Sequence, residues 1–230
     1  MPRADQQRAG SAMIGGLVHK IRDPLAAIKL SIELLLAGHD LQENDQVVLL
    51  RVVEEIRRIE LLVKGFLDFA QPVEVQLTTL NINQVAAETV QFMENQPAFA
   101  LSPPDRKIVC QFAADLPDTA GDLQKLQQAF IHLLLNAAEA MPGGGTVMIK
   151  TWCDADAGTV GVDVSDTGKG VPAALVEKIF DPFFTTKAQG IGLGLALAKN
   201  LVEAQGGRIT ATSKASAGAA IHVALPLRKP

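Results

Sequence analysis

Two neighbouring segments near the C-terminus decide how this chain is interpreted: residues 180–187 are FDPFFTTK and residues 190–195 are GIGLGL. The glycine-rich segment opens a stretch of helical periodicity near residues 193–204. Glycines at a helix N-terminus present backbone N–H groups and the positive end of the helix dipole to phosphate oxygens. A lone GxGxG is more often a tight turn, so the segment predicts a phosphate site only together with partners elsewhere.

Two segments upstream supply these partners. Asn136 lies late in a predicted helix, about residues 123–141, and its amide oxygen is a hard, neutral ligand suited to Mg²⁺ beside phosphates. Residues 166–170, DTGKG, directly follow a predicted strand. The Asp166 carboxylate can accept a hydrogen bond from an exocyclic amine, and the glycines let the backbone approach a flat base closely. Each signal is weak alone, but the three in this order and spacing predict a nucleotide-binding site.

The first third of the chain predicts two helices. A polar segment, residues 38–45, separates two apolar seams whose residues recur at alternating steps of three and four. The seams comprise Ile14, Val18, Ile21, Leu25, Ile28, Ile32 and Leu35, and then Leu49, Val52, Ile56, Ile59, Val63 and Phe66. We predict an antiparallel hairpin that dimerises into a four-helix bundle, because a hairpin alone leaves each stripe half covered. Packing of the hairpin on the rest of its own chain is the alternative.

A mixed α/β pattern follows Pro72, which ends the second helix. We expect further helices near residues 82–94, 123–141 and 193–204, and strands near residues 107–112, 146–152, 159–164, 208–213 and 220–225. The sequence therefore predicts two domains, residues 1–72 and 73–230.

Composition excludes several classes of protein. The 230 residues are 48% apolar and 20% charged, enough to bury a core, and the net charge of −4 argues against a general nucleic-acid-binding surface. Cys110 and Cys153 stand in no metal-ligand or disulfide spacing, which favours reduced cysteines in an intracellular protein. We expect a cytoplasmic chain, since no run is long enough for a membrane span and the N-terminus lacks a signal-peptide layout.

Taken together, these segments resemble the catalytic core of a bacterial two-component sensor histidine kinase, close to the nitrogen-regulation sensors. Five family motifs are matched in order: the H box by residues 19–25, the N box by Gln128 and residues 136–137, the G1 box by residues 166–170, the F box by residues 180–187 and the G2 box by residues 190–195. The resemblance covers about residues 13–227. It implies a dimeric phospho-acceptor hairpin followed by an α+β two-layer sandwich, the Bergerat (GHKL) ATP-binding fold shared with Hsp90, gyrase and MutL.

The resemblance also implies roles for individual residues, with ATP and Mg²⁺ as cofactors. Asn136 would hold Mg²⁺, and Asp166 would bind the adenine amine. Gly168 and Gly170 would pack against the base, Gly190, Gly192 and Gly194 would border the phosphates and the lid, Phe183 and Phe184 would anchor that short lid, and Lys187 would reach a phosphate. His19 would accept the phosphoryl group. The apolar seam agrees, because it places His19 on the solvent face of the bundle, where a neutral imidazole is a competent nucleophile.

The expected activity is that of an autokinase that phosphorylates His19 and passes the phosphoryl group to an aspartate of a response-regulator receiver domain. The alternatives are a degenerate scaffold that binds a receiver domain but turns over little ATP, and an ATP-driven clamp without a phosphohistidine.

Four departures from the family pattern bear on this choice. Lys20 stands where an acidic residue usually helps to deprotonate the histidine, and its charge would lower the pKa of His19. Asp23 replaces the usual Asn; it supplies a carboxylate on the same helix face and suggests weakened phosphatase activity. His132 replaces a second Asn of the N box, and Ala219 replaces a Thr whose hydroxyl commonly bonds near the adenine.

Overall fold

The computed structural model describes residues 21, 24–33, 35, 43–70, 72–95, 106–187, 190–213 and 217–227. The chain divides into two compact units. The first comprises residues 1–71 and 185–193, and the second comprises residues 72–184 and 194–230.

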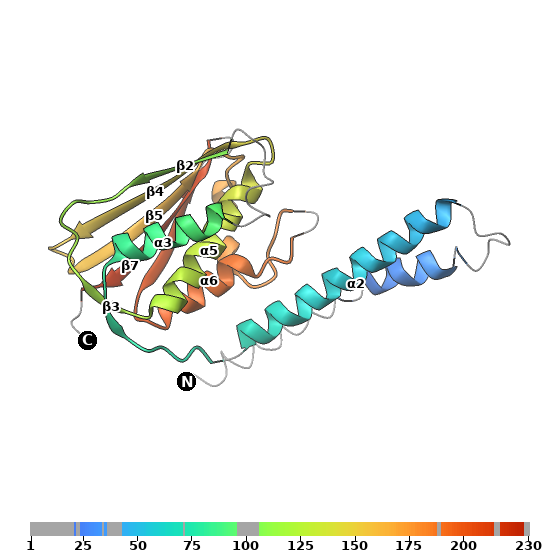
Figure 1. Ribbon diagram of the computed structural model, residues 1–230, viewed down its shortest axis with the longest axis horizontal. Helices are drawn as coiled ribbons and strands as arrows, with labels where there is room; N and C mark the ends of the chain where they lie inside the picture. The colour runs from blue at the N-terminus through green and yellow to red at the C-terminus, as the bar shows by residue number, and fades with distance from the viewer. Residues whose placement is uncertain are drawn as a thin grey trace. The chain divides into compact units, whose positions relative to one another are not determined.

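The described part of the first unit is helical. Residues 24–33 form one helix, and α2, Glu43–Ala70, is the second (Figure 1). The described residues of both predicted helices are therefore helical, and residues 14–20 of the first apolar seam lie outside the described residues. The second helix ends just before Pro72, as a residue without a backbone N–H requires. Among the described residues, no helix is long and apolar enough to cross a membrane.

In the described part of the second unit, a five-stranded sheet carries helices α3 (Ile82–Glu94), α5 (Leu123–Ala140) and α6 (Gly194–Glu203) on one face (Figure 1). The strand order is β2 (Arg106–Gln111), β4 (Gly145–Asp154), β5 (Thr159–Asp166), β7 (Ala219–Pro226) and β6 (Arg208–Ser213). Only the β2–β4 pair is parallel. Sheet and helices together are the predicted two-layer sandwich, in which β4 and β5 form an antiparallel hairpin.

The shortest elements of the fold were not predicted. Strands β1 (Thr78–Leu80) and β3 (Thr119–Gly121) form a separate antiparallel pair, and two single 3₁₀ turns lie at Ala173–Leu175 and Lys178–Phe180. Three residues are too few to show a period of two or three, so only tertiary pairing reveals such elements.

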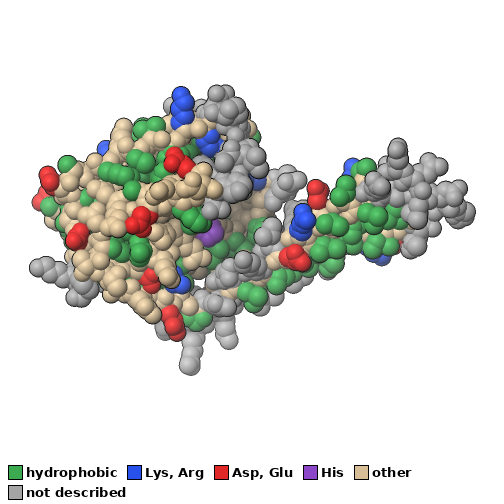
Figure 2. Space-filling view, viewed as in Figure 1, with side chains coloured by type: hydrophobic (Ala, Val, Ile, Leu, Met, Phe, Trp, Pro, Cys, Tyr) green, Lys and Arg blue, Asp and Glu red, His purple; other side chains and the backbone are tan. Residues whose placement is uncertain are grey.

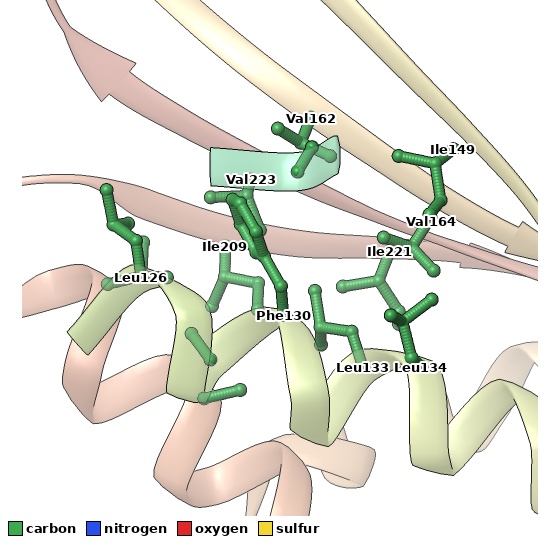
Figure 3. Packing of buried hydrophobic residues seen from close by; sticks show 14 of the residues in the cluster. Leu126, Phe130, Leu133, Leu134, Ile149, Val162, Val164, Ile209, Ile221 and Val223 are labelled. Atoms are coloured by element: carbon green, nitrogen blue, oxygen red, sulfur yellow. The ribbon is translucent and has the colours of Figure 1, made fainter. Parts of the chain in front are cut away.

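The core lies between α5 and the sheet. Figure 3 shows apolar side chains of α5 pointing at those of the strands. The helix contributes Leu126, Phe130, Leu133 and Leu134, and the strands contribute Ile149, Val162, Val164, Ile209, Ile221 and Val223. On the helix these positions recur at steps of three and four, whereas on β5 they alternate, as each element's geometry requires.

The opposite face of the sheet carries a polar network. Asp163 lies between the inward-facing Val162 and Val164, and its Oδ1 accepts from the indole N–H of Trp152 (2.8 Å) and contacts Nδ1 of His222 (2.9 Å). Nε2 of the same histidine lies 2.9 Å from the hydroxyl of Thr212. The network joins four adjacent strands, so His222 is a structural residue of the sheet.

The two cysteines are free thiols, as expected from their spacing. Partial burial, and after it the Glu94 carboxylate, raise the pKa of Cys110.

A raised pKa lowers the thiolate fraction at pH 8, so we expect iodoacetamide to alkylate Cys110 more slowly in the folded chain than in urea. Glu94→Gln lowers that pKa again and should increase the rate up to a few-fold. Mass spectrometry of the Cys110 peptide measures it. Glu88→Gln on the same helix is the control, and an equal response to both substitutions would contradict the assignment.

Candidate functional site

Helix α5 positions Asn136. The helix begins at Asp122, whose side-chain Oδ1 accepts the N–H of Lys125 (3.1 Å) as an N-cap. At the other end Nη2 of Arg106 donates to the carbonyl oxygen of Ala138 (2.8 Å), which fixes the last turn. Asn136 is half-buried and lies one turn before the end of this doubly anchored helix. Arg106 was missed in the sequence because its role depends on pairing with a distant helix end.

The loop at residues 166–170 lies against the end of α5. A Cβ on Gly168 would lie 2.6 Å from the carbonyl oxygen of Ala140, so only glycine fits this approach. The N–H of Lys169 also faces that oxygen, at 3.4 Å. Asn136 precedes Ala140 by one turn and therefore shares its helix face. The structure thus brings the predicted metal ligand and the predicted base-binding loop together.

Asp166 forms the first turn of this loop. It ends β5, and its Oδ1 accepts the N–H of Gly168 (2.8 Å). The next residue, Thr167, accepts the N–H of Thr146 (3.0 Å) through its hydroxyl, which ties the loop to β4. Gly170 has a φ of +67°, a conformation that favours glycine. The carboxylate is therefore held in a defined orientation by the loop that follows it.

Gly218 approaches Asp166 from another side. A Cβ on Gly218 would overlap the carbonyl oxygen of Asp166, and its φ of +80° also favours glycine. The preceding strand is tied to the same turn, because the Ser213 hydroxyl donates to the carbonyl oxygen of Gly218 (2.8 Å) and accepts the N–H of Val171 (2.7 Å). The turn that carries Ala219, one of the departures from the family pattern, therefore packs directly on the loop 166–170.

This contact predicts a large effect of Gly218→Ala on stability. Gly158 is a matched control, because its φ is +62° and no atom lies within 4 Å of an added Cβ. An alanine at position 158 would have the backbone strain without the overlap. We expect Gly158→Ala to lower the free energy of unfolding by about 1 kcal/mol and Gly218→Ala to lower it by about 3 kcal/mol. Urea denaturation measures both values, and the dependence of the unfolding free energy on urea concentration should be the same in the two variants. Equal losses in the two variants would show that the overlap is relieved without strain.

The start of α6 lies beside α5 at His132. A Cβ on Gly194, the first residue of α6, would lie 3.7 Å from Nδ1 of His132, an ordinary contact distance. His132 and Asn136 are one turn apart, so one face of α5 meets the start of α6 at His132 and the base-binding loop at Ala140. Asn136 lies between these two contacts.

Three predicted phosphate-site residues belong to the segment 185–193 of the first unit. The N–H of Lys187 donates to the hydroxyl of Thr185 (3.1 Å), and the N–H of Gly190 donates to the carbonyl oxygen of Lys187 (3.2 Å). A Cβ on Gly190 would lie 2.5 Å from the Thr185 hydroxyl, and Gly192 has a φ of +76°. Both glycines are therefore required by the turn geometry of the segment itself.

A strained turn precedes that segment. Phe183 is the only non-glycine residue with positive φ among the described residues, at +66°, and it is buried. Phe184 packs on the core. The ammonium nitrogen of Lys199 lies over the ring of Phe180, 5.9 Å from the ring centroid. A strained conformation persists where surrounding packing enforces it. The three phenylalanine rings therefore hold the chain in place at residues 180–184, where the segment 72–184 of the second unit ends.

The remaining predicted site residues, His19, Lys20 and Asp23, lie outside the described residues. Of the others, the structure places the loop 166–170 against the end of α5 at Ala140, and the start of α6 at Gly194 beside His132.

Two known protein families match separate parts of the chain. Residues 11–74 match the family "His Kinase A (phospho-acceptor) domain", and residues 121–229 match "Histidine kinase-, DNA gyrase B-, and HSP90-like ATPase". The first match includes His19, and the second begins at the end of β3 and includes α5, the base-binding loop and α6.

Individual relatives extend over the whole chain. The signal transduction histidine-protein kinase AtoS of Escherichia coli K12 is 31% identical over 99% of this chain and 36% of its own length. The sensor histidine kinase ZraS of Escherichia coli O157:H7 is 33% identical over 99% of this chain and 48% of its own length. The chain thus spans about a third to a half of these relatives.

A solved structure shows the same fold. Histidine kinase ThkA, crystallised in complex with the response regulator protein TrrA, has a TM-score of 0.76 at 24% identity, covering 99% of this chain and 64% of that one. With both domain families matched in one chain, and with histidine kinases similar to it along its length, the chain carries the catalytic core of a two-component sensor histidine kinase.

Proposed function

We propose that the chain is an ATP-dependent protein histidine kinase that phosphorylates itself on His19. The observation that carries the proposal is the presence, in one chain, of a phospho-acceptor domain match that includes His19 and an ATPase domain match. We assign residues 1–72 to dimerisation and phosphotransfer and residues 73–230 to ATP binding. In the reaction the bond from the γ-phosphorus of ATP to the bridging oxygen breaks, a bond from phosphorus to an imidazole nitrogen forms, and ADP leaves.

The ATP site is proposed to lie along α5 and the base-binding loop. Asp166 would accept the adenine amine, with the glycines at 168 and 170 against the flat base. The closeness of Gly168 to Ala140 supports this, because the loop has no side chain at the point where the loop meets α5. Gly194 would direct the N-terminus of α6 at the phosphates, and Lys187, Gly190 and Gly192 would border them.

Asn136 fits the proposed metal. Its amide supplies a neutral oxygen on a helix fixed at both ends, and Mg²⁺ bound with ATP typically takes one or two protein oxygens besides those of the phosphates. Bound there, Mg²⁺ would neutralise the charge of the transferring phosphoryl group. The protein's own contribution is to hold Asn136 and Asp166 in a fixed relation, since phosphoryl transfer depends mainly on positioning.

The first unit is proposed to form a homodimer. Apolar side chains between 40% and 63% exposed recur along α2: Val47, Leu49, Leu50, Val53, Ile56, Val63 and Leu67. Figure 2 shows hydrophobic side chains gathered along this helix. Leu49, Ile56 and Val63 are spaced by seven residues, the repeat of a helix–helix seam. An exposed seam of this kind is covered when a second copy completes a four-helix bundle.

The phosphoryl acceptor beyond His19 is proposed to be an aspartate of a receiver domain. ThkA was crystallised with a response regulator, and this chain shares the ThkA fold over 99% of its length. Asp23 would supply a carboxylate near His19 on the same helix face. Because the reaction consumes ATP, we place it in the cytoplasm.

The experiment that tests the proposal is incubation of the purified chain with γ-labelled ATP and Mg²⁺. We expect covalent label that is lost in acid and retained in base, as for a phosphoramidate. Label with the opposite lability would indicate a phosphoester and contradict the assignment to histidine. ATP binding without any label would support the degenerate scaffold instead.

A further inference from the structure

Asp122 is a buried carboxylate that joins separate segments of the second unit. Its side chain is 8% exposed, and one oxygen caps α5 through the N–H of Lys125. The other oxygen, Oδ2, accepts the backbone N–H of Gln76 at 2.8 Å. Gln76 lies in the extended segment between α2 and β1. An N-cap requires only the hydrogen bond from Lys125, so the hydrogen bond from Gln76 is not part of the cap and has a different role.

The carboxylate is held on a buried base. The backbone N–H of Asp122 donates to Oε1 of Gln205 (2.7 Å), and Nε2 of Gln205 donates to the carbonyl oxygen of Leu201 in α6 (2.8 Å). Gln205 is only 3% exposed. Asp122 is therefore linked by hydrogen bonds to both α5 and α6, the helices that carry Asn136 and Gly194.

The segment that Asp122 holds is the one that leads away from α2. Val73 and Val75 are half-buried and alternate with exposed residues, and Val73 packs on the core of the second unit. The segment continues into β1, which pairs with β3, and β3 ends at Gly121, the neighbour of Asp122. The hydrogen bond from Gln76 to Asp122 is thus the backbone anchor of residues 73–77.

We propose that Asp122 is a positioning residue that makes Val73 the first residue of the rigid ATP-binding unit, so that motion relative to the first unit is taken up before Val73. This inference rests on the proposed function in one respect: such motion brings bound ATP to His19. A short tether keeps the effective concentration of the γ-phosphoryl group at His19 high. If the anchor is lost, the free tether grows from two residues, 71–72, to as many as seven, 71–77. The −3/2 power dependence on tether length then gives a fall of up to roughly sixfold.

Three variants separate the anchor from the cap. Gln76→Pro removes only the N–H that Asp122 accepts, and an extended segment tolerates proline. Asp122→Asn replaces one carboxylate oxygen with an NH₂ group, while Asn is as good an N-cap as Asp. Gln76→Ala keeps the backbone N–H and is the matched control.

Hydrogen exchange of the full chain, followed by mass spectrometry, tests the anchor directly. In Gln76→Pro and Asp122→Asn we expect faster exchange at residues 77–80, with α5 as protected as in the wild type and in Gln76→Ala. Unchanged exchange at residues 77–80, or loss of protection throughout α5, would overturn the proposal. This readout holds even if the wild-type chain forms no phosphohistidine, an outcome that would refute the proposed function alone.

Autophosphorylation kinetics test the consequence. We expect kcat to fall by up to roughly sixfold in Gln76→Pro while KM for ATP stays within about twofold, because the ATP site is intact and only its delivery changes. Gln76→Ala should match the wild type. An increase in KM at constant kcat would assign Asp122 and Gln76 to the ATP site itself and contradict a positioning role.

Discussion

Replacement of His19 by alanine is expected to abolish covalent labelling of the chain by γ-labelled ATP. The imidazole is the proposed nucleophile, and a methyl group cannot form a bond to phosphorus, so the label should fall to background, more than about 100-fold. The label per chain, measured after denaturing electrophoresis, gives the result. Nucleotide affinity should stay at the wild-type value, because the proposed ATP-binding residues lie at positions 136–194.

His39→Ala is the matched control for this substitution. His39 also belongs to the N-terminal third, and it stands in the polar segment 38–45 that separates the two apolar seams. It should keep full labelling. Acid-labile label that survives in His19→Ala and disappears in His39→Ala would show that His39, and not His19, is the phosphorylated residue. Full labelling of wild type and of His39→Ala would in addition show that Lys20 and His132 are compatible with activity.

Replacement of Asn136 by alanine is expected to lower the rate of autophosphorylation by about 100-fold at saturating ATP. This corresponds to about 2.7 kcal/mol of lost transition-state stabilisation, the order expected when a metal ligand beside the transferring group is removed. Alanine is a better helix former than asparagine, so α5 and the thermal stability of the domain should be retained. The Mg²⁺ concentration for half-maximal rate should rise, which distinguishes a metal ligand from a residue that only shapes the pocket.

Gln124→Ala removes an exposed amide from the same helix and is the control for Asn136→Ala. It should leave the rate and its Mg²⁺ dependence unchanged. A wild-type rate in Asn136→Ala at the same Mg²⁺ concentration would remove Asn136 from the metal site. Its position between His132 and Ala140 would then be structural.

Much of the fold was predictable because the large elements carry their own periodicity. The apolar positions of α5 recur every three or four residues over five turns, and the helix was predicted within one residue of its observed end, Ala140. Strand β5 alternates around Asp163, and residues 155–158 form the turn that joins it to β4. Strands β1 and β3 were not predicted, because three residues carry no readable period.

The candidate site was predicted as a set of residue types, and its construction was not. Asn136, Asp166 and the glycines stand in recognisable local motifs. Arg106 and Gln205, which help to hold α5 and α6 in place, stand in none, because each forms a hydrogen bond to a residue far away along the chain, 32 residues for Arg106 and 83 for Gln205. Asp122 is a local N-cap of α5, but its hydrogen bond from Gln76 spans 46 residues.

Periodicity along the sequence predicted the helices of both units and the longer strands of the second, and motif spacing predicted a nucleotide site, because both are local properties. The two-layer sandwich was implied by the resemblance to the kinase family. The reason why particular glycines are required becomes visible in the tertiary structure alone. Gly168 must lie against the carbonyl oxygen of Ala140, and Gly218 against that of Asp166. Steric exclusion between segments far apart in sequence depends on how the chain packs, and no local pattern encodes it.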